Sequence, residues 1–236
     1  MNRCLKCLSS YFEKPSWSLL FMKKNLNPLC YECFNELKWI SGVRCRLCSR
    51  SLDKISVRLQ KNGTCFDCIR WIKGTETKDL LESNISILEY NAFLKEWFAQ
   101  FKFKGDAVAA SYFGNVLYKT YKSKYAEYTV ATIPLSQKSL EDRTFNQVDL
   151  MIQNWRCRRL ILGRLERDKQ SKKSREERIA LVGHSPFYVK EIAEKDLLKK
   201  VVLIDDIYTT GTTVRQAAKS LKEAGVETVA SLTVAR

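Results

Sequence analysis

The sequence has almost no histidine and no long apolar run. Its 236 residues include one histidine, four prolines and nine glycines, and a single histidine leaves no Ser-His-Asp arrangement to argue for. Without about 20 consecutive apolar residues no transmembrane helix is predicted, and the first 25 residues lack the apolar core of a secretory signal. None of the nine glycines is followed by Lys-Ser or Lys-Thr, which excludes a P-loop motor, and no G-x-G-x-x-G occurs.

Acidic side chains are scarce relative to basic ones. The chain has 41 Lys and Arg against 26 Asp and Glu, and the excess lies in residues 1–74 (14 basic, 5 acidic) and 156–178 (10 basic, 4 acidic). Such charge, with tryptophans nearby (Trp17, Trp39, Trp71), predicts a polyanionic partner, nucleic acid before membrane. The alternative is a surface that serves solubility alone. The predicted contacts to single-stranded DNA lie in the second segment: Arg156, Arg158, Arg159, Lys172 and Lys173.

Eight of the nine cysteines form four Cys-x-x-Cys pairs. Two such pairs complete a tetrahedral Cys₄ zinc site. Sequential pairing would give two zinc ribbons and a cross-braced arrangement would join alternate pairs; the spacing leaves both open. Because Cys₄ offers no open position for water, we expect one or two structural zinc ions and no catalysis there. The predicted ligands are Cys4, Cys7, Cys30, Cys33, Cys45, Cys48, Cys65 and Cys68.

The cysteines also bear on compartment and domain organisation. With no predicted signal peptide, a reducing cytoplasm is the expected location, and it disfavours disulfides. An N-terminal region with few apolar runs cannot build a core alone, so metal would supply its folding energy. We expect a zinc-ribbon domain over residues 1–74 and a second domain over 75–236, with the polar residues 73–79 at the boundary. Cys157 is interpreted as an incidental thiol.

The stretch VVLIDDIYTTGTT (201–213) has the pattern of a ligand-binding turn. Its first four residues are a non-alternating apolar run, typical of a central strand buried on both faces. An apolar stripe from Val214 predicts a helix that stops at Gly225, and a strand over 226–234 follows. A helix N-terminus attracts phosphate, and carboxylates at a strand end bind sugar hydroxyls or hydrated Mg²⁺. The sequence predicts a phosphorylated-ribose site formed by Asp205, Asp206, Thr209, Thr210, Gly211, Thr212 and Thr213.

Between the cysteine-rich region and the 201–213 stretch, the spacing of apolar residues predicts four further elements. Aromatic stripes indicate two helices, over 94–101 and 108–116, and residues 128–134 indicate a strand. Residues 145–162 indicate one basic amphipathic helix, followed by a charged loop over 163–178.

The 201–213 stretch resembles the phosphoribosyl pyrophosphate signature of type I phosphoribosyltransferases, in which a hydrophobic strand leads into two acids and T-T-G-x-T. The resemblance implies an α/β fold, a Rossmann-like parallel sheet, preceded here by the N-terminal Cys₄ zinc-ribbon domain. It also implies that Asp205 and Asp206 face the ribose hydroxyls, that residues 209–213 cradle the 5′-phosphate, and that Mg²⁺ accompanies the ligand.

Three more segments narrow the resemblance. FKFKGD (101–106), IPLSQKSLEDRTFNQ (133–147) and QSKKSREER (170–178) resemble segments of bacterial ComF-family late competence proteins, as does the final Val-Ala-Arg. These proteins join a double zinc ribbon to a phosphoribosyltransferase-like domain. The resemblance implies a protein that helps imported single-stranded DNA through the uptake machinery in natural transformation, beside the competence helicase. Its expected place is cytoplasmic and peripheral to the membrane apparatus.

Two classes of function follow. As a binding protein, the chain would hold single-stranded DNA and a phosphoribosyl pyrophosphate-like ligand. As an enzyme, it would transfer the phosphoribosyl group to a nucleobase-like acceptor with Mg²⁺, and basic side chains would stabilise the departing pyrophosphate. Binding is favoured over turnover, because Ser136, Ser139 and Thr144 stand where the family commonly has histidine, arginine and glycine. The candidate catalytic residues are Lys138, Arg143, Arg175 and Arg178.

Overall fold

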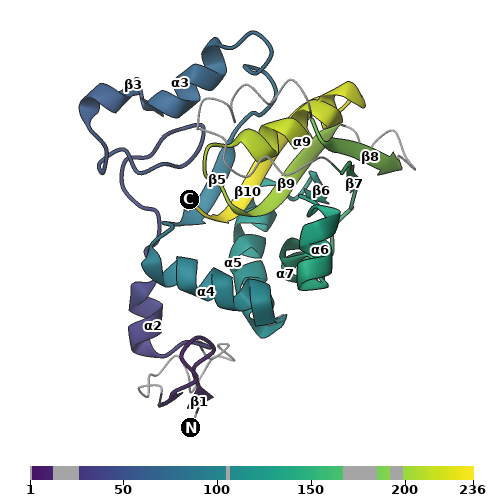
Figure 1. Cartoon of the computed structure of the whole chain (residues 1–236). Helices are drawn as coiled ribbons and strands as arrows, with labels where there is room; N and C mark the ends of the chain where they lie inside the picture. The colour runs from purple at the N-terminus through teal and green to yellow at the C-terminus, as the bar shows by residue number, and fades with distance from the viewer. Residues whose placement is uncertain (1, 13–26, 105–106, 167–184, 192–198) are drawn as a thin grey trace.

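The computed structural model describes residues 2–12, 27–104, 107–166, 185–191 and 199–236 (Figure 1). Its centre is a four-stranded parallel sheet with strand order β5-β10-β9-β6. The strands are β5 (Asn84–Leu88), β10 (Thr228–Ala235), β9 (Lys200–Ile207) and β6 (Thr129–Thr132). Residues 201–204 of β9 are completely buried, which confirms the predicted central strand. Because all four strands are parallel, their carboxyl ends meet at one edge of the sheet.

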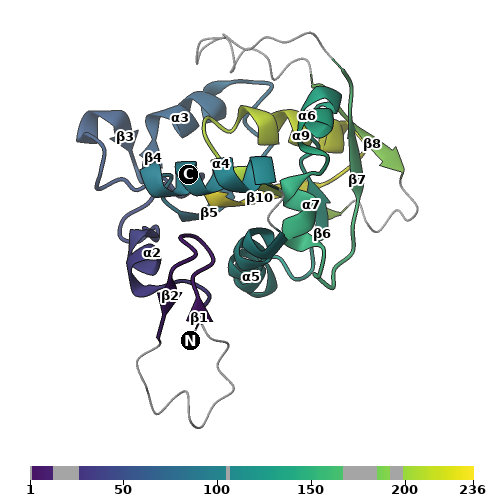
Figure 2. The ribbon, with the colours of Figure 1, turned by 60° about the horizontal axis from the view of Figure 1, so that its bottom comes forward.

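Helices cover both faces of this sheet. Val202 and Ile204 of β9 pack with helices α4 (Ala92–Lys104), α5 (Ala107–Lys124) and α7 (Gln147–Ile152). Val201 and Leu203 point the other way and pack with α9 (Thr212–Glu223). Figure 2 shows α9 and α5 on opposite sides of the sheet. The predicted helices at 94–101 and 108–116 are confirmed within α4 and α5, and the predicted β9–α9–β10 unit is confirmed.

The predicted single helix over 145–162 is wrong. Helix α7 ends at Ile152, where the Arg159 side chain donates hydrogen bonds to the carbonyls of Ile152 and Gln153. Leu160 then donates its backbone N–H to Val130, and β7 (Ile161–Arg164) follows. The alternating burial of Leu160 and Leu162 suits a strand, so tertiary packing overrides the helical period here. The predicted loop therefore starts later than residue 163.

Two smaller elements flank β7. Strand β8 (Phe187–Glu191) pairs with it in an antiparallel hairpin, and α6 (Gln137–Arg143) follows the carboxyl end of β6. Ser136 caps α6 by accepting the Ser139 N–H.

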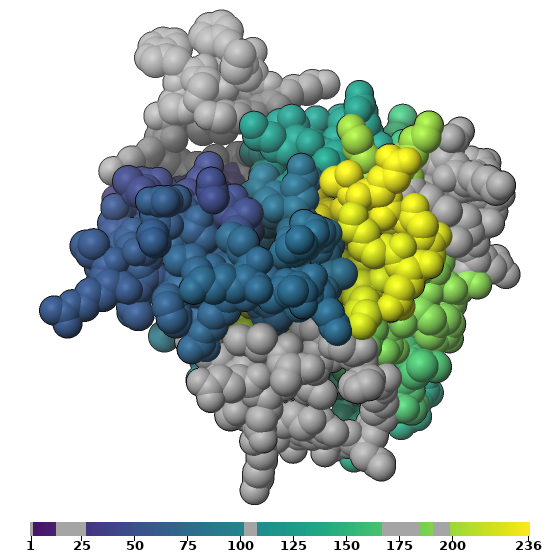
Figure 3. Space-filling model, turned by 90° about the horizontal axis from the view of Figure 1, so that it is seen from above, coloured from purple at the N-terminus to yellow at the C-terminus, as the bar shows by residue number. Residues whose placement is uncertain are grey.

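The cysteine-rich region forms two modules at different places on the sheet domain. The first module (residues 2–12 and 27–37) contains β1 (Asn2–Arg3), β2 (Ser10–Tyr11) and α2 (Tyr31–Glu36), and packs beside α4, where Lys6 pairs with Glu96 at 2.6 Å. The second module (residues 43–73) contains η1 (Val57–Leu59), β3 (Gln60–Lys61), β4 (Thr64–Cys65) and α3 (Phe66–Lys73). It shares a core with β9 and α9 and lies directly against the C-terminal residues (Figure 3). The two cysteine clusters thus belong to different cores of the molecule.

Candidate sugar-phosphate site and metal centres

The eight paired cysteines gather into two clusters that join consecutive pairs. Cys4, Cys7, Cys30 and Cys33 form one, and Cys45, Cys48, Cys65 and Cys68 form the other, with all four Sγ atoms of each cluster within 4.8 Å of one another. All are free thiols in the structure. The arrangement is the sequential one, so the cross-braced alternative is excluded.

The sulfur spacing fits a tetrahedral ion. Zn–S bonds of about 2.3 Å place the sulfur atoms of a tetrahedral site about 3.8 Å apart. The Cys7 and Cys30 Sγ atoms are 3.8 Å apart, and those of Cys48 and Cys65 are 3.6 Å apart. The second cluster is buried throughout, whereas Cys7 of the first is exposed. Each cluster could hold one zinc ion as a closed Cys₄ centre.

The same turn builds the first half of both clusters. Leu8 and Ser49, each directly after the second cysteine of a pair, both have φ 62°. Their N–H groups donate to the carbonyls of Cys4 and Cys45, at 2.9 Å in each case. This left-handed residue closes the knuckle and brings both sulfur atoms to one side. The two modules therefore repeat one local structure.

The two acids of the predicted ribose site lie in the last residues of β9. Asp206 is buried, with 7% of its surface exposed, and Asp205 is half-buried. The Gln147 side chain donates to Asp206 Oδ2 at 3.1 Å, and the Ile207 N–H donates to Asp206 Oδ1 at 2.7 Å. Asp205 Oδ1 accepts the N–H of Asp206 at 2.9 Å. These contacts fix both carboxylates at the carboxyl edge of the sheet.

The loop after β9 leads into the N-terminus of α9. Gly211 is the residue before the first helical turn and has φ 82°, in the left-handed region that favours glycine. A Cβ there would lie 2.1 Å from the Tyr208 hydroxyl and 2.4 Å from Arg215 Nη1. The hydroxyls of Thr210 and Thr212 are 2.9 Å apart, and Thr213 is exposed. The helix N-terminus and the threonines make this loop suited to bind a phosphate group.

Side chains from the second module and from α9 support the loop from behind. Trp71, at the end of α3, donates its Nε1–H to the Thr210 carbonyl at 2.9 Å. Its ring lies under the Arg215 guanidinium, 4.5 Å from the ring centre. Arg215 donates to the Tyr208 hydroxyl at 2.7 Å, and burial raises the pKa of Tyr208 to about 12, so this phenol stays neutral.

Arg215 is a buried cation behind the phosphate loop. Only 3% of its surface is exposed, and its Nε has no hydrogen-bond partner in the part of the chain that the structure describes. Among the described residues, no carboxylate lies within ion-pair distance of it. Buried charges are normally paired, so a cation here favours an anion at the adjacent loop.

Only some of the predicted basic residues lie in the part of the chain that the structure describes. Arg143, at the end of α6, donates to Gln147 at 3.3 Å and so contacts the residue that holds Asp206. Lys138 is exposed on α6. The other predicted positions, Arg175, Arg178, Lys172 and Lys173, lie outside the described residues.

The predicted DNA-binding arginines are exposed but not equivalent. Arg158 donates to the Glu127 carbonyl at 2.8 Å, and Arg159 caps α7, so both also have structural contacts. Arg156 lies beside a hollow of about 200 Å³ with Asn115 and Asn154.

The predicted stacking tryptophans also differ from one another. Trp71 is buried, with 2% of its surface exposed, and Trp39 is 43% exposed. Trp17 lies outside the described residues.

Sequence reasoning missed several residues of this site. Gln147 was noted only as part of a motif, while Tyr208, Arg215 and Trp71 had no assigned role at the phosphate loop. Arg164 also lies near the acids. Burial lowers the pKa of its guanidinium, and the negative charges of Glu166 and Asp205 act in the opposite direction. The adjacency of Tyr208 and Arg215 to the threonine loop was a usable signal, whereas the sequence held none for Trp71.

The chain is similar to several known proteins. A phosphoribosyl transferase domain model matches residues 165–236. The chain is 35% identical to competence protein ComFC of Bacillus subtilis over 99% of its length and 94% of that protein. It is 32% identical to competence protein ComFC of Streptococcus pneumoniae, over 99% of its length and all of that protein. A hypoxanthine phosphoribosyltransferase structure from Staphylococcus aureus matches at a TM-score of 0.31 and 12% identity, covering 54% of this chain and 62%, less than two thirds, of that one.

No helix in the described part of the chain is both long and apolar enough to cross a bilayer.

Proposed function

Because the chain belongs to the family of ComFC competence proteins, we propose that it assists the internalisation of single-stranded DNA during natural transformation. In this role it binds single-stranded DNA and a phosphoribosyl pyrophosphate-like ligand. It works with the competence helicase and the DNA-uptake machinery, at the cytoplasmic side of the membrane. The family assignment names neither ligand, and a different feature of the molecule supports each of the two.

The observation that carries the sugar-phosphate part is the loop at 209–213. It joins a central strand to a helix of 12 residues, begins that helix with a left-handed glycine, and lies over the buried Arg215. The 5′-phosphate would accept hydrogen bonds from the N–H groups of the first helical turn and from the threonine hydroxyls. Asp205 and Asp206 would receive the ribose hydroxyls or hold a hydrated Mg²⁺.

The DNA part is supported by charge. The chain has 15 more basic than acidic groups, and phosphate contacts from such groups dominate sequence-independent affinity for nucleic acids. The zinc ions are structural in this proposal, one in each module, and stabilise a region with little core of its own.

A second candidate function is phosphoribosyl transfer to a nucleobase-like acceptor. The observation that favours it is the contact from Arg143 through Gln147 to Asp206, which brings a cation of α6 next to the proposed ribose site. In that reaction the bond from C1′ to pyrophosphate would break, the acceptor nitrogen would bond to C1′ and lose its proton to solvent, and pyrophosphate would leave; a Mg²⁺ ion held at Asp205 and Asp206 would supply positive charge. Arg143 and Lys138 would stabilise the charge on the departing group.

Calorimetric titration of purified protein tests the proposal. Phosphoribosyl pyrophosphate with Mg²⁺ should bind in the micromolar to millimolar range, and ribose without phosphates should not. An oligonucleotide titration followed by fluorescence anisotropy tests DNA binding separately. Release of pyrophosphate in the presence of nucleobases distinguishes turnover from binding. Absence of binding by both ligands would contradict the proposal.

A further inference from the structure

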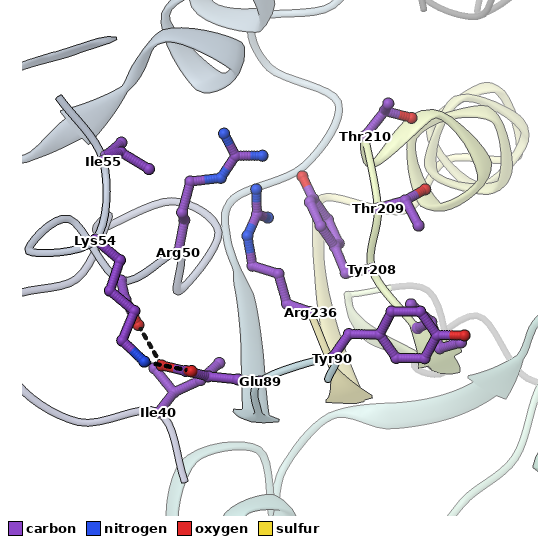
Figure 4. A pocket seen from close by; sticks show the side chains of 12 residues that line it. Ile40, Arg50, Lys54, Ile55, Glu89, Tyr90, Tyr208, Thr209, Thr210 and Arg236 are labelled. Atoms are coloured by element: carbon purple, nitrogen blue, oxygen red, sulfur yellow. Dashed lines mark hydrogen bonds and ion pairs between the residues drawn. The ribbon is translucent and has the colours of Figure 1, made fainter. Parts of the chain in front are cut away.

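A cavity of about 530 Å³ lies between the second module and the loop at 209–213 (Figure 4). Its floor is the carboxyl edge of the sheet. Glu89 and Tyr90 follow β5, Ile207 is the last residue of β9 and residues 208–210 follow it, and Arg236 follows β10. The second module supplies the opposite wall through Arg50, Lys54 and their neighbours. Ligands of open α/β sheets bind at this edge, and a volume of this size admits a nucleotide.

The lining is rich in positive charge. Arg50, Lys54 and Arg236 face the cavity, and Glu89 is the only acid among the described residues that line it. Arg50 pairs with Asp67 at 2.8 Å and Lys54 with Glu89 at 2.5 Å. The Lys54 side chain is 65% exposed, so its pair is weak enough for a phosphate to compete.

Arg236 has an unusual environment. Its guanidinium lies over the Tyr208 ring, 4.9 Å from the ring centre, and Nη1 donates to the Cys48 carbonyl at 3.1 Å. Its buried Nε has no hydrogen-bond partner, and among the described residues no carboxylate pairs with it. Figure 4 shows the guanidinium groups of Arg50 and Arg236 and the Tyr208 hydroxyl directed to the same part of the cavity. Two gathered cations favour an anion between them.

The cavity also has an aromatic wall. Tyr90 is 40% exposed, and its ring stacks on Phe98 with an interplanar angle of 21°. The backbone N–H of Tyr90 donates a hydrogen bond to the carbonyl of Arg236, so Tyr90 is held beside that cation. A positively charged groove with a rigid aromatic ring is the usual platform for a base and phosphate of single-stranded nucleic acid.

The cavity overlaps the sites already assigned only at Thr209 and Thr210. The candidate pyrophosphate residues Lys138 and Arg143 lie on α6, which follows β6, whereas the cavity lies over β5, β10 and β9. The threonine loop forms only one of its walls, through Thr209 and Thr210. A ligand here is therefore a second one, next to the sugar phosphate.

We propose that one nucleotide of a single-stranded DNA binds in this cavity, with its base stacked on Tyr90 and its flanking phosphates against Arg50, Arg236 and Lys54. This inference rests on the DNA-binding part of the proposed function and assigns that binding a place. The strand then runs across the junction of the second module and the sheet, and touches the loop that is proposed to hold the sugar phosphate.

Photo-cross-linking tests the location directly. The probe is an oligothymidylate that carries 5-iododeoxyuridine and has no terminal phosphate, so that it cannot imitate a 5′-phosphate at the loop. After irradiation and digestion, mass spectrometry should find Tyr90 as the main cross-linked residue. Cross-links confined to other residues, such as those around Arg156, would overturn the proposal.

Affinity measurements with matched variants give an independent test. Tyr90→Ala should weaken binding of the same oligonucleotide by about 5- to 100-fold through lost stacking, whereas Tyr31→Ala, 80% exposed on α2, should not. Lys54→Ala should reduce the slope of log K against log salt by about 0.7, and Arg58→Ala, an exposed cation of the same module outside the cavity, should leave it unchanged. Equal behaviour within both pairs would contradict the proposal while leaving DNA binding elsewhere intact. Absence of DNA binding by the wild type would instead remove the proposed function.

Discussion

The indole Nε1 of Trp71 donates a hydrogen bond of 2.9 Å to the carbonyl of Thr210, 139 residues later in the chain. Trp71 is three residues beyond Cys68 of the second cysteine cluster, on the same helix α3. Thr210 belongs to the loop that is proposed to hold the 5′-phosphate. One hydrogen bond therefore connects the second cysteine cluster to the candidate ligand site.

Trp71→Phe should weaken phosphoribosyl pyrophosphate binding about fivefold. Phenylalanine keeps an aromatic ring under Arg215 but removes the N–H, and a lost hydrogen bond of this kind costs about 1 kcal/mol. The loop would then sample more conformations before it binds. Calorimetry measures the effect, with Trp39→Phe, at a half-exposed tryptophan, as the control. Equal affinity of the two variants would show that the bond does not position the loop.

Loss of metal from the second cluster should lower sugar-phosphate affinity, and loss from the first should not. Wild-type protein should contain two zinc ions, and Cys7→Ser and Cys68→Ser should each contain one. Only Cys68→Ser should bind the ligand more weakly. Because coupling is reciprocal, saturating ligand should slow zinc release to a chelator in one of two kinetic phases of the wild type. Slowing of both phases or of neither would contradict this coupling.

How far the sequence predicted the site depends on the range of the contacts. The strand, the acid pair and the threonine loop are adjacent in the chain, so local pattern was sufficient for them. The cysteine spacing predicted metal ligands, but the choice between sequential and cross-braced pairing needed the fold, because both satisfy the same local geometry. The contact from Trp71 to Thr210 has no local signature. It depends on where the second module docks.

The failed helix prediction at 145–162 has a related cause. The apolar period continues past Ile152. However, the Arg159 side chain donates hydrogen bonds to the last carbonyls of α7, and the Leu160 N–H donates a hydrogen bond to β6. A hydrogen bond to a strand 30 residues earlier decides the conformation there, and periodicity contains no information about it.

Asp206→Asn should weaken Mg²⁺-dependent phosphoribosyl pyrophosphate binding by about tenfold. The substitution preserves shape and leaves an acceptor for Gln147, but it removes the negative charge, and hydrogen bonds to a charged group contribute about 1.5–3 kcal/mol. Asp142→Asn, an exposed position on α6, is the matched control. Titrations with and without Mg²⁺ measure the difference. An unchanged affinity for Asp206→Asn would remove Asp206 from the site.

Gly211→Ala should reduce ligand binding more than backbone strain alone explains. Both Gly211 and Gly63 have positive φ, at 82° and 68°, but a Cβ at Gly63 meets no atom within 4 Å. At Gly211 the added Cβ would displace Tyr208 and Arg215 beneath the loop. Gly63→Ala is therefore a control for strain. Thermal unfolding should show a stability loss for both variants that is larger for Gly211→Ala, and calorimetry should show loss of ligand affinity only for Gly211→Ala. Equal ligand affinities would contradict a role for close backbone approach.

Arg156→Glu should flatten the salt dependence of single-stranded DNA binding. Each phosphate contact contributes about −0.7 to the slope of log K against log salt, so loss of one contact should raise the slope by about that amount. Arg156 is the best single test of the basic segment, because it is exposed while Arg158 and Arg159 also donate to backbone carbonyls.

The control for that variant is Lys119→Glu, an exposed position on α5 that causes the same change in net charge. If Arg156 contacts the strand, only its variant changes the slope, and zinc content and sugar-phosphate affinity stay as in the wild type. If both variants reduce affinity equally, the DNA strand is attracted by the overall electrostatic field of the protein and not by this segment. That outcome would contradict the sequence-based assignment of Arg156. The proposed nucleotide site at Tyr90 would not be affected by that outcome.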